Sequence, residues 1–167
     1  MASAYATGLQ LLARRELCEA QVRTRLARRR FEPDDIEAAV TRLRRERALD
    51  DRRTALACAR TEAHLKRHGR LRALRKVEAL GIASDVAREA IAEVFGDLDE
   101  DLLIEQALDR RLGPHASLEE APAVRRLHRY LLAQGFDAAR VHAAIRNRVK
   151  HAATTERPAV HFDDTHQ

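Results

Sequence analysis

The feature that most constrains the fold is a block of about fifty residues that occurs three times along the chain. The copies align without a gap, and Phe31, Ile82 and Phe136 occupy the same position in each. These anchors lie 51 and 54 residues apart. A unit of this length cannot bury its apolar face alone, so neighbouring units stack, and stacked helical units present a long surface. The repeat therefore predicts a binding protein rather than an enzyme.

Composition and spacing both favour helices. Apolar residues make up 45% of the chain, Ala and Leu dominate them, and only 4% of residues are aromatic. We therefore predict an all-α fold in which three tandem three-helix repeats form an elongated, curved array. The predicted repeats are residues 1–48, 49–96 and 97–150, and residues 151–167 form a predicted disordered tail. Helical spacing predicts buried faces that contain Tyr5, Leu9 and Leu12, then Leu71, Leu74 and Val77, then Leu98, Leu102, Ile104, Leu108 and Leu112.

The turn before each anchor has its own signature. Gly81 and Gly135 precede two of the anchors, and glycine adopts the left-handed conformation that commonly ends a helix. Arg30 stands at the same position in the first copy. A residue other than glycine held left-handed costs on the order of 1 kcal/mol. We therefore expect Arg30→Gly to raise the melting temperature.

Local signals also mark where helices begin. Pro33 suits the first position of a helix, where its missing N–H would lack an intrahelical partner anyway. Asp50, Ser84 and Asp137 precede apolar runs and can accept hydrogen bonds from free N–H groups, so we predict that they cap helices. The pair formed by Asp50 and Asp51 is interpreted as helix-end charge rather than as a catalytic pair.

The charges are unevenly distributed along the chain. Residues 1–80 carry 20 Lys and Arg against 11 Asp and Glu, whereas residues 81–167 carry 11 against 15. Codon usage in a GC-rich genome can explain the preference for Arg over Lys, but not this segregation. The basic half is therefore the expected docking surface for a polyanion or an acidic partner.

Two basic clusters in that half are candidate partner-binding sites. The first surrounds the end of the second predicted helix and consists of Arg25, Arg28 and Arg29, with Arg23 and Arg30 beside them. The second lies opposite the predicted apolar face of the next hairpin and consists of Arg70, Arg72, Arg75 and Lys76. The alternative is that both are ordinary solvated helix faces, which is the default for charged residues.

The chain offers little for catalysis or metal binding. His64 and His68 have a spacing that can hold a metal, but Lys66 and Arg67 flank them and no third ligand is evident. Cys18 and Cys58 are too far apart in sequence for a zinc or redox motif, and we interpret them as packing residues. No nucleotide-binding or nucleophile signature occurs. We therefore expect no catalytic residue, metal or cofactor.

The sequence also lacks the signals of a membrane protein or a secreted protein. No run of about 18 apolar residues exists, and the first ten residues lack the features of a signal peptide. We expect a cytoplasmic protein.

Several motifs together resemble the RecX family of RecA regulators. The resemblance covers roughly Ala4 to Val149. It is carried by LLARRE (Leu11 to Glu16), by Leu49-Asp50-Asp51 followed by Arg53 and Ala55, by Gly69 with Arg72, and by Leu80-Gly81-Ile82. The chain departs from the family pattern at Thr54 (usually aromatic), Arg70 (usually Pro), Leu80 (usually Lys), Cys18 (usually Ser) and Arg30 (usually Gly).

The resemblance implies a monomeric helical protein that lies in the groove of the RecA filament on DNA and touches DNA weakly or indirectly. There it would slow the ATPase and strand exchange of RecA and favour loss of the filament, in recombination, DNA repair and the SOS response. The alternatives are a stand-alone basic nucleic-acid-binding protein, in which one hairpin enters a groove of DNA, and a scaffold for an unrelated acidic protein. Affinity for naked DNA distinguishes the RecA regulator from the stand-alone nucleic-acid-binding protein.

Overall fold

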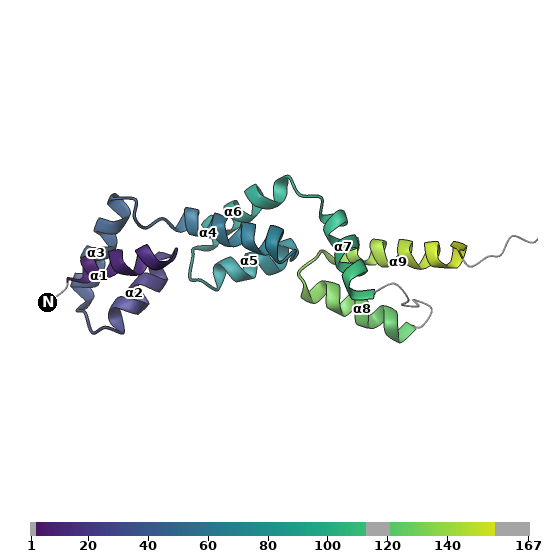
Figure 1. The fold of residues 1–167 in the computed structure, drawn as a ribbon, viewed down its shortest axis with the longest axis horizontal. Coiled ribbons are helices and arrows are strands. Elements are labelled where there is room, and N and C mark those ends of the chain that lie inside the picture. Colours follow the sequence, from purple (N-terminus) through teal and green to yellow (C-terminus); the bar gives the residue numbers. More distant parts are fainter. Residues whose placement is uncertain (1–2, 113–120, 156–167) are drawn as a thin grey trace, which may run out of the picture.

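The structure, a computed structural model, describes residues 3–112 and 121–155, and these residues form helices without any strand (Figure 1). The first repeat contains α1 (Ala4–Arg14), α2 (Glu19–Ala27) and α3 (Pro33–Arg45). The second contains α4 (Asp51–Arg60), the π-helical turn η1 (Thr61–Leu65), α5 (Arg70–Glu78) and α6 (Ser84–Gly96). The third contains α7 (Glu100–Leu112), α8 (Ala121–Ala133) and α9 (Ala138–Thr155). The three bundles follow one another along the long axis, so the predicted all-α, elongated array of three-helix repeats is confirmed.

The left-handed turns are as predicted. Gly81 and Gly135 have φ values of 90° and 89°, and Arg30 has a φ of 62°. All three repeats therefore end their second helix in the same way, although only two of them use glycine.

The helix starts follow the predictions with one exception. Asp50 accepts a hydrogen bond from the Arg53 N–H at 2.9 Å, and Asp137 caps α9 in the same manner. The predicted cap at Ser84 is wrong, because α6 begins at Ser84 itself and Ala83 stands at the cap without a side-chain hydrogen bond. Helix α9 also continues to Thr155, past the predicted end at residue 150. The rest of the predicted tail, residues 156–167, lies outside the described residues.

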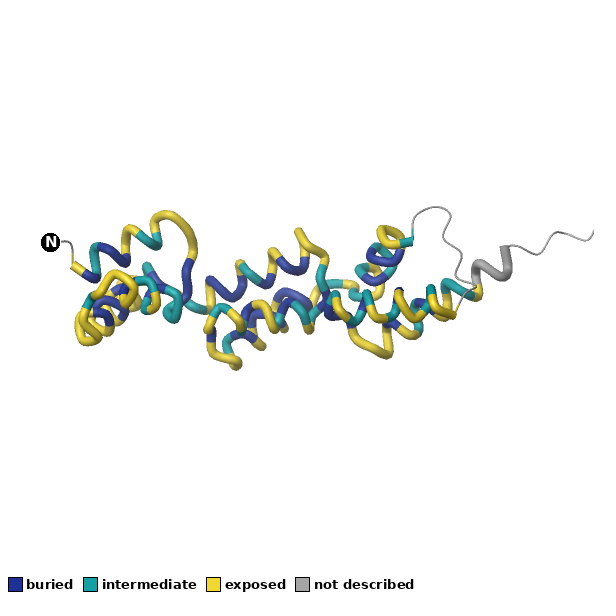
Figure 2. Tube along the Cα trace, turned by 90° about the horizontal axis from the view of Figure 1, so that it is seen from below, coloured by how far each residue is buried: buried dark blue, intermediate teal, exposed yellow. Residues whose placement is uncertain are grey.

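Each repeat encloses its own group of buried side chains, seen as dark stretches on facing helices in Figure 2. The first core is built on branched residues such as Leu26, Val40 and Leu43. The second is rich in alanine, and the third centres on Phe136 and its aliphatic neighbours. Two buried residues cross between repeats: Cys18 packs into the second core, and Leu49, which was predicted to open the second repeat, packs into the first. The half-buried Leu98, which was predicted to lie on the apolar face of the third repeat, packs against the second core instead.

Three residues that were predicted to be buried are exposed. Leu9, Leu71 and Leu102 expose 37%, 52% and 54% of their surface. In α1 the buried residues are small ones, Ala4, Thr7 and Gly8. A Cβ atom at Gly8 would lie 2.8 Å from Leu43 Cδ1, so α1 approaches α3 too closely for larger side chains to point inward. Close helix packing has therefore rotated the larger residues outward.

Candidate partner-binding surfaces

The first and second repeats meet where the turn between α5 and α6 contacts the start of α2. The Cys18 thiol, fully buried, donates to the Leu80 carbonyl oxygen over 2.9 Å. A Cβ atom at Gly81 would lie 2.6 Å from Ala20 Cβ. Asp51 accepts from the Glu19 N–H at 2.8 Å, so this carboxylate caps a helix of the preceding repeat. We call this contact the first joint.

The second and third repeats meet through the same geometry, which we call the second joint. The Gly69 N–H donates to the Gln134 carbonyl oxygen over 2.9 Å, and the Leu71 N–H donates to the Gly135 carbonyl oxygen over 3.0 Å. A Cβ atom at Gly135 would lie 2.3 Å from the backbone nitrogen of Arg72. In the sequence repeat, Gly69 corresponds to Cys18 and Gln134 corresponds to Leu80. The array is therefore built by using one joint twice.

This joint explains why Arg30 can stand where the other repeats have glycine. Gly81 and Gly135 need both a positive φ and room for a neighbouring helix. Arg30 shares the positive φ, but its side chain is exposed rather than packed against a neighbouring helix. The cost of the turn remains there, but no clash is added to it.

Three of the candidate residues lie beside the first joint. Arg25 and Arg28 line a small cleft of about 240 Å³ together with Leu80. Lys76 lines a neighbouring cleft of about 310 Å³ that Leu80 also borders. Arg29 is exposed, and its guanidinium donates to the Arg25 carbonyl oxygen over 3.2 Å. The fold therefore brings part of the first basic cluster and Lys76 of the second toward the same contact between repeats.

Sequence reasoning missed two further cations of that region, Arg15 and Lys66, which line the same cleft as Lys76. They lie far apart in the sequence, and the fold brings the connection between α1 and α2, the end of η1 and α5 to one cleft. We call the surface formed by Arg15, Arg25, Arg28, Lys66 and Lys76 the first-joint basic surface.

Arg70 and Arg72 belong to the second joint. Arg70 Nε lies 3.3 Å from Glu100 Oε1, and Arg72 Nη1 donates to the Ala133 carbonyl oxygen over 3.2 Å. Both side chains are half-buried, so their predicted place on an exposed face is wrong. The reason is the close backbone approach at Gly135, which presses the start of α5 against the third repeat. Arg75 of the same predicted cluster is exposed.

Apart from Glu100, which pairs with Arg70, three carboxylates of α7 are paired within the third repeat. Asp101 binds Arg140 of α9 at 2.9 Å. Arg148, two turns further along α9, lies 3.6 Å from Glu105 and also pairs with Asp109. These carboxylates are therefore neutralised by α9 rather than by the basic first half of the chain.

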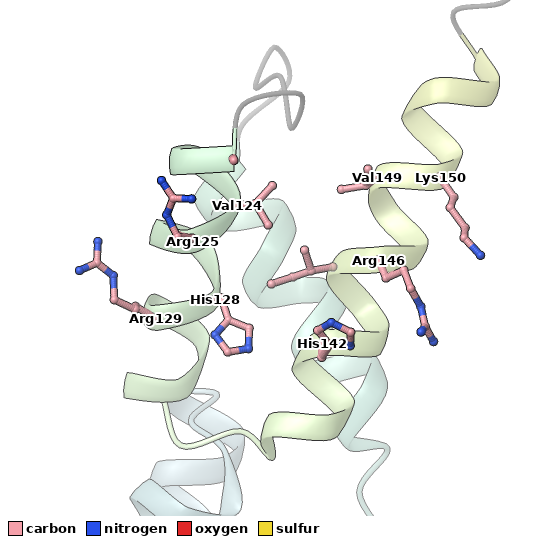
Figure 3. Close-up of a pocket in the computed structure, with 10 residues that line it drawn as sticks. Val124, Arg125, His128, Arg129, His142, Arg146, Val149 and Lys150 are labelled. Atoms are coloured by element: carbon pink, nitrogen blue, oxygen red, sulfur yellow. The ribbon is translucent and has the colours of Figure 1, made fainter.

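The opposite side of the α8–α9 hairpin carries a groove of about 820 Å³ (Figure 3). Four basic residues border it, Arg125, Arg129, Arg146 and Lys150. Sequence reasoning missed this site because it summed charge over half the chain. Residues 121–150 contain seven Lys and Arg and one acidic residue, so a finer division of the sequence gives the signal.

One buried carboxylate lines the cleft of Lys76. Glu62 in η1 is 2% exposed and lies 2.6 Å from both Lys66 Nζ and His68 Nδ1. Burial raises the pKa of Glu62, but the hydrogen bonds from Lys66 and His68 outweigh burial and hold that pKa below its ordinary value. His68 is therefore occupied with a contact to Glu62 rather than held toward His64.

The described residues contain no group of three or more side chains that could hold a metal ion. Burial raises the pKa of the Cys18 and Cys58 thiols, which disfavours the reactive thiolate. Asp50 caps α4, as the sequence predicted, whereas Asp51 caps α2 of the preceding repeat, which the sequence did not predict. None of the described helices has both the length and the apolar character that crossing a membrane requires.

A row of helical repeats in which cations outnumber carboxylates along the clefts has the architecture of the proteins that work by binding through a long surface. Comparison with known proteins identifies the family. The family model described as "RecX, first three-helix domain" matches residues 4–43. The regulatory protein RecX of Xanthomonas oryzae pv. oryzae is 33% identical over 138 residues, which cover 83% of this chain and 84% of that protein.

Further relatives agree. The regulatory protein RecX of Thermus thermophilus is 36% identical over 127 residues, which cover 76% of this chain and 72% of that protein. The crystal structure of RecX from Lactobacillus salivarius has the same fold, with a TM-score of 0.74 over 89% of this chain and 95% of that chain at 18% identity. The chain belongs to the RecX family of regulatory proteins.

Proposed function

We propose that this protein binds the RecA filament on DNA and restrains it, by slowing its ATPase and strand exchange and by limiting filament growth. The observation that carries the proposal is the match to regulatory RecX proteins over most of the chain. Such a protein acts in the cytoplasm, as a monomer, and needs no catalytic residue or cofactor. Its contact with DNA is weak or indirect.

The physics of the array supports this function. A filament repeats the same surface at regular intervals, and an elongated row of similar repeats can contact several of its subunits at once. Arginine binds carboxylates in bidentate fashion and also binds phosphates, so a basic surface suits a protein partner that lies on DNA. We assign the first contact to the first-joint basic surface, with Arg29 and Arg75 exposed beside it.

Substitutions that test this proposal should lie outside the second joint, so that they change the binding surface without disturbing the fold. Reversal of charge at Arg72 would remove its hydrogen bond to the Ala133 carbonyl oxygen and disturb the fold. Arg28 and Lys76 are both exposed and border the two clefts of the first joint. The pair Arg28→Glu with Lys76→Glu therefore reverses charge at the proposed contact, and among the described residues neither side chain makes a hydrogen bond or ion pair that the change would break.

The experiment measures binding of the labelled protein to RecA filaments assembled on single-stranded DNA. The Arg28→Glu and Lys76→Glu double variant should bind about tenfold more weakly or worse. The control is Arg45→Glu with Arg88→Glu, an equal change of charge at exposed residues that border neither cleft. Circular dichroism of both variants checks that the helices remain.

Two results would count against the proposal. Full filament binding by the folded Arg28 and Lys76 variant would move the contact to another surface. Tight binding to naked duplex DNA at moderate salt, with no dependence on RecA, would favour the stand-alone nucleic-acid-binding protein.

A further inference from the structure

The third repeat differs from the other two in the length of its hairpin. Helix α8 has 13 residues and α9 has 18. The corresponding helices have 9 and 13 residues in both other repeats. The additional turns lie at the end of the hairpin away from its turn, where α8 and α9 diverge (Figure 3). The divergence opens the groove, and its described lining comes from α8 and α9.

The floor of this groove is apolar. Val124 from α8 and Val149 from α9 point into it from opposite sides. Ile145 also lines it and is 5% exposed, as part of the third core. The groove therefore continues the hydrophobic core to the surface, so an apolar side chain that enters it would pack against the core and leave water.

The rims of the groove are basic. Arg125 and Arg129 project along α8 on one side, and Arg146 and Lys150 project from α9 on the other. Among the described residues, none that lines the groove carries a carboxylate. Asp101, Glu105 and Asp109 of α7 are paired with Arg140 and Arg148 instead. The field at the groove is therefore positive on both sides of an apolar strip.

We propose that the α8–α9 groove binds an acidic amphipathic helix of a protein partner. Such a helix places apolar side chains along one face at positions i, i+3 or i+4, and i+7, and an apolar groove receives that face. Carboxylates beside the face would meet the two basic rims. The groove volume of about 820 Å³ lies within the range of ligand sites in proteins. Single-stranded nucleic acid fits less well, because its bases stack on aromatic side chains and the described lining contains only histidine rings.

This groove is separate from the first-joint basic surface, so the proposal does not depend on RecA as the partner. The probe is a fluorescein-labelled peptide of about 15 residues with leucines at the stated spacing and glutamates between them. Fluorescence anisotropy measures its binding to the full-length chain. A scrambled peptide of the same composition and a single-stranded oligothymidylate are measured beside it. The designed peptide should bind, and the scrambled peptide should bind at least about tenfold more weakly.

Three variants locate the binding. Arg125→Glu should weaken binding about tenfold, because an attraction at the rim becomes a repulsion. Arg126→Glu is the matched control, since it makes the same change one residue along α8 at an exposed side chain that does not line the groove, and it should bind like the wild type. Val124→Thr keeps the shape but makes the floor polar, and it should weaken binding about fourfold, the loss expected for one buried methyl group.

Other outcomes would overturn the proposal. Equal binding of both peptides and of the oligothymidylate, insensitive to Val124→Thr, would make the groove a general polyanion surface. Equal weakening by Arg125→Glu and Arg126→Glu would mean that net charge rather than the groove is recognised. Absence of designed-peptide binding to the folded wild-type protein would refute the assignment directly.

Discussion

The joint between repeats gives the sharpest test of the fold, through Gly81. A Cβ atom at this position would lie 2.6 Å from Ala20 Cβ, and the backbone has a φ of 90°. Gly81→Ala therefore adds two costs. Alanine held left-handed costs about 1–2 kcal/mol, and a single extra carbon in a tightly packed contact costs about 1–2 kcal/mol, the lower part of the range for overpacking. We expect a total loss of about 2–4 kcal/mol in the free energy of unfolding.

The two costs can be separated because the atom that is met belongs to a side chain. Ala20→Gly removes that methyl group at a cost of about 1 kcal/mol in helix propensity. In this background Gly81→Ala should retain only the left-handed strain. The difference between the two backgrounds, a coupling energy of about 1–2 kcal/mol, measures the contact between repeats.

Urea unfolding followed by far-ultraviolet circular dichroism supplies the four free energies of this cycle. Gly96→Ala serves as the control, because Gly96 closes α6 and a Cβ atom there would meet nothing within 4 Å. It should leave stability unchanged or slightly raised. An equal loss from Gly81→Ala in both backgrounds would show that the turn strain acts alone and that the first joint is not packed as described.

Three further predictions concern single residues. Arg30→Gly should raise the midpoint of thermal unfolding by relieving the left-handed strain, and an unchanged or lower midpoint would contradict it. The pKa of Glu62 is lowered in the folded protein, so this carboxylate should stabilise the protein at a pH above its ordinary pKa of 4.5. That stability should be lost as the pH falls through the lower pKa of the folded state. Glu62→Gln should therefore be less stable at neutral pH in urea titrations and lose less on acidification, whereas equal acid sensitivity would be a failure of the argument. Cys18→Ser should retain the hydrogen bond across the first joint. Cys18→Ala should leave the Leu80 carbonyl unpaired and lose about 1–3 kcal/mol in the free energy of unfolding, measured by urea titration. Equal stability of the two variants would refute this role of Cys18.

Local features of the fold were predictable from the sequence. The repeat anchors, the left-handed turns at Gly81 and Gly135, and the helix caps at Asp50 and Asp137 depend on residues within a few positions of one another. Short-range stereochemistry determines these features, so the pattern of residues is sufficient to recognise them.

The joints were not predictable in the same way. The second reason for glycine at position 135 is the approach of Arg72 from another repeat, and nothing near Gly135 in the sequence indicates it. The same approach half-buries Arg70 and Arg72, which looked like an exposed basic face. The α8–α9 groove was missed for a different reason, because the acidic residues of α7 concealed its positive charge in the sum over half the chain.

We propose that this protein acts on the RecA filament. The most direct test measures the ATPase activity of RecA on single-stranded DNA while this protein is added in substoichiometric amounts. A parallel titration without RecA measures binding to the DNA alone. We expect progressive inhibition of the RecA ATPase together with weak binding of this protein to naked DNA. An unchanged ATPase together with tight binding to DNA alone would contradict it.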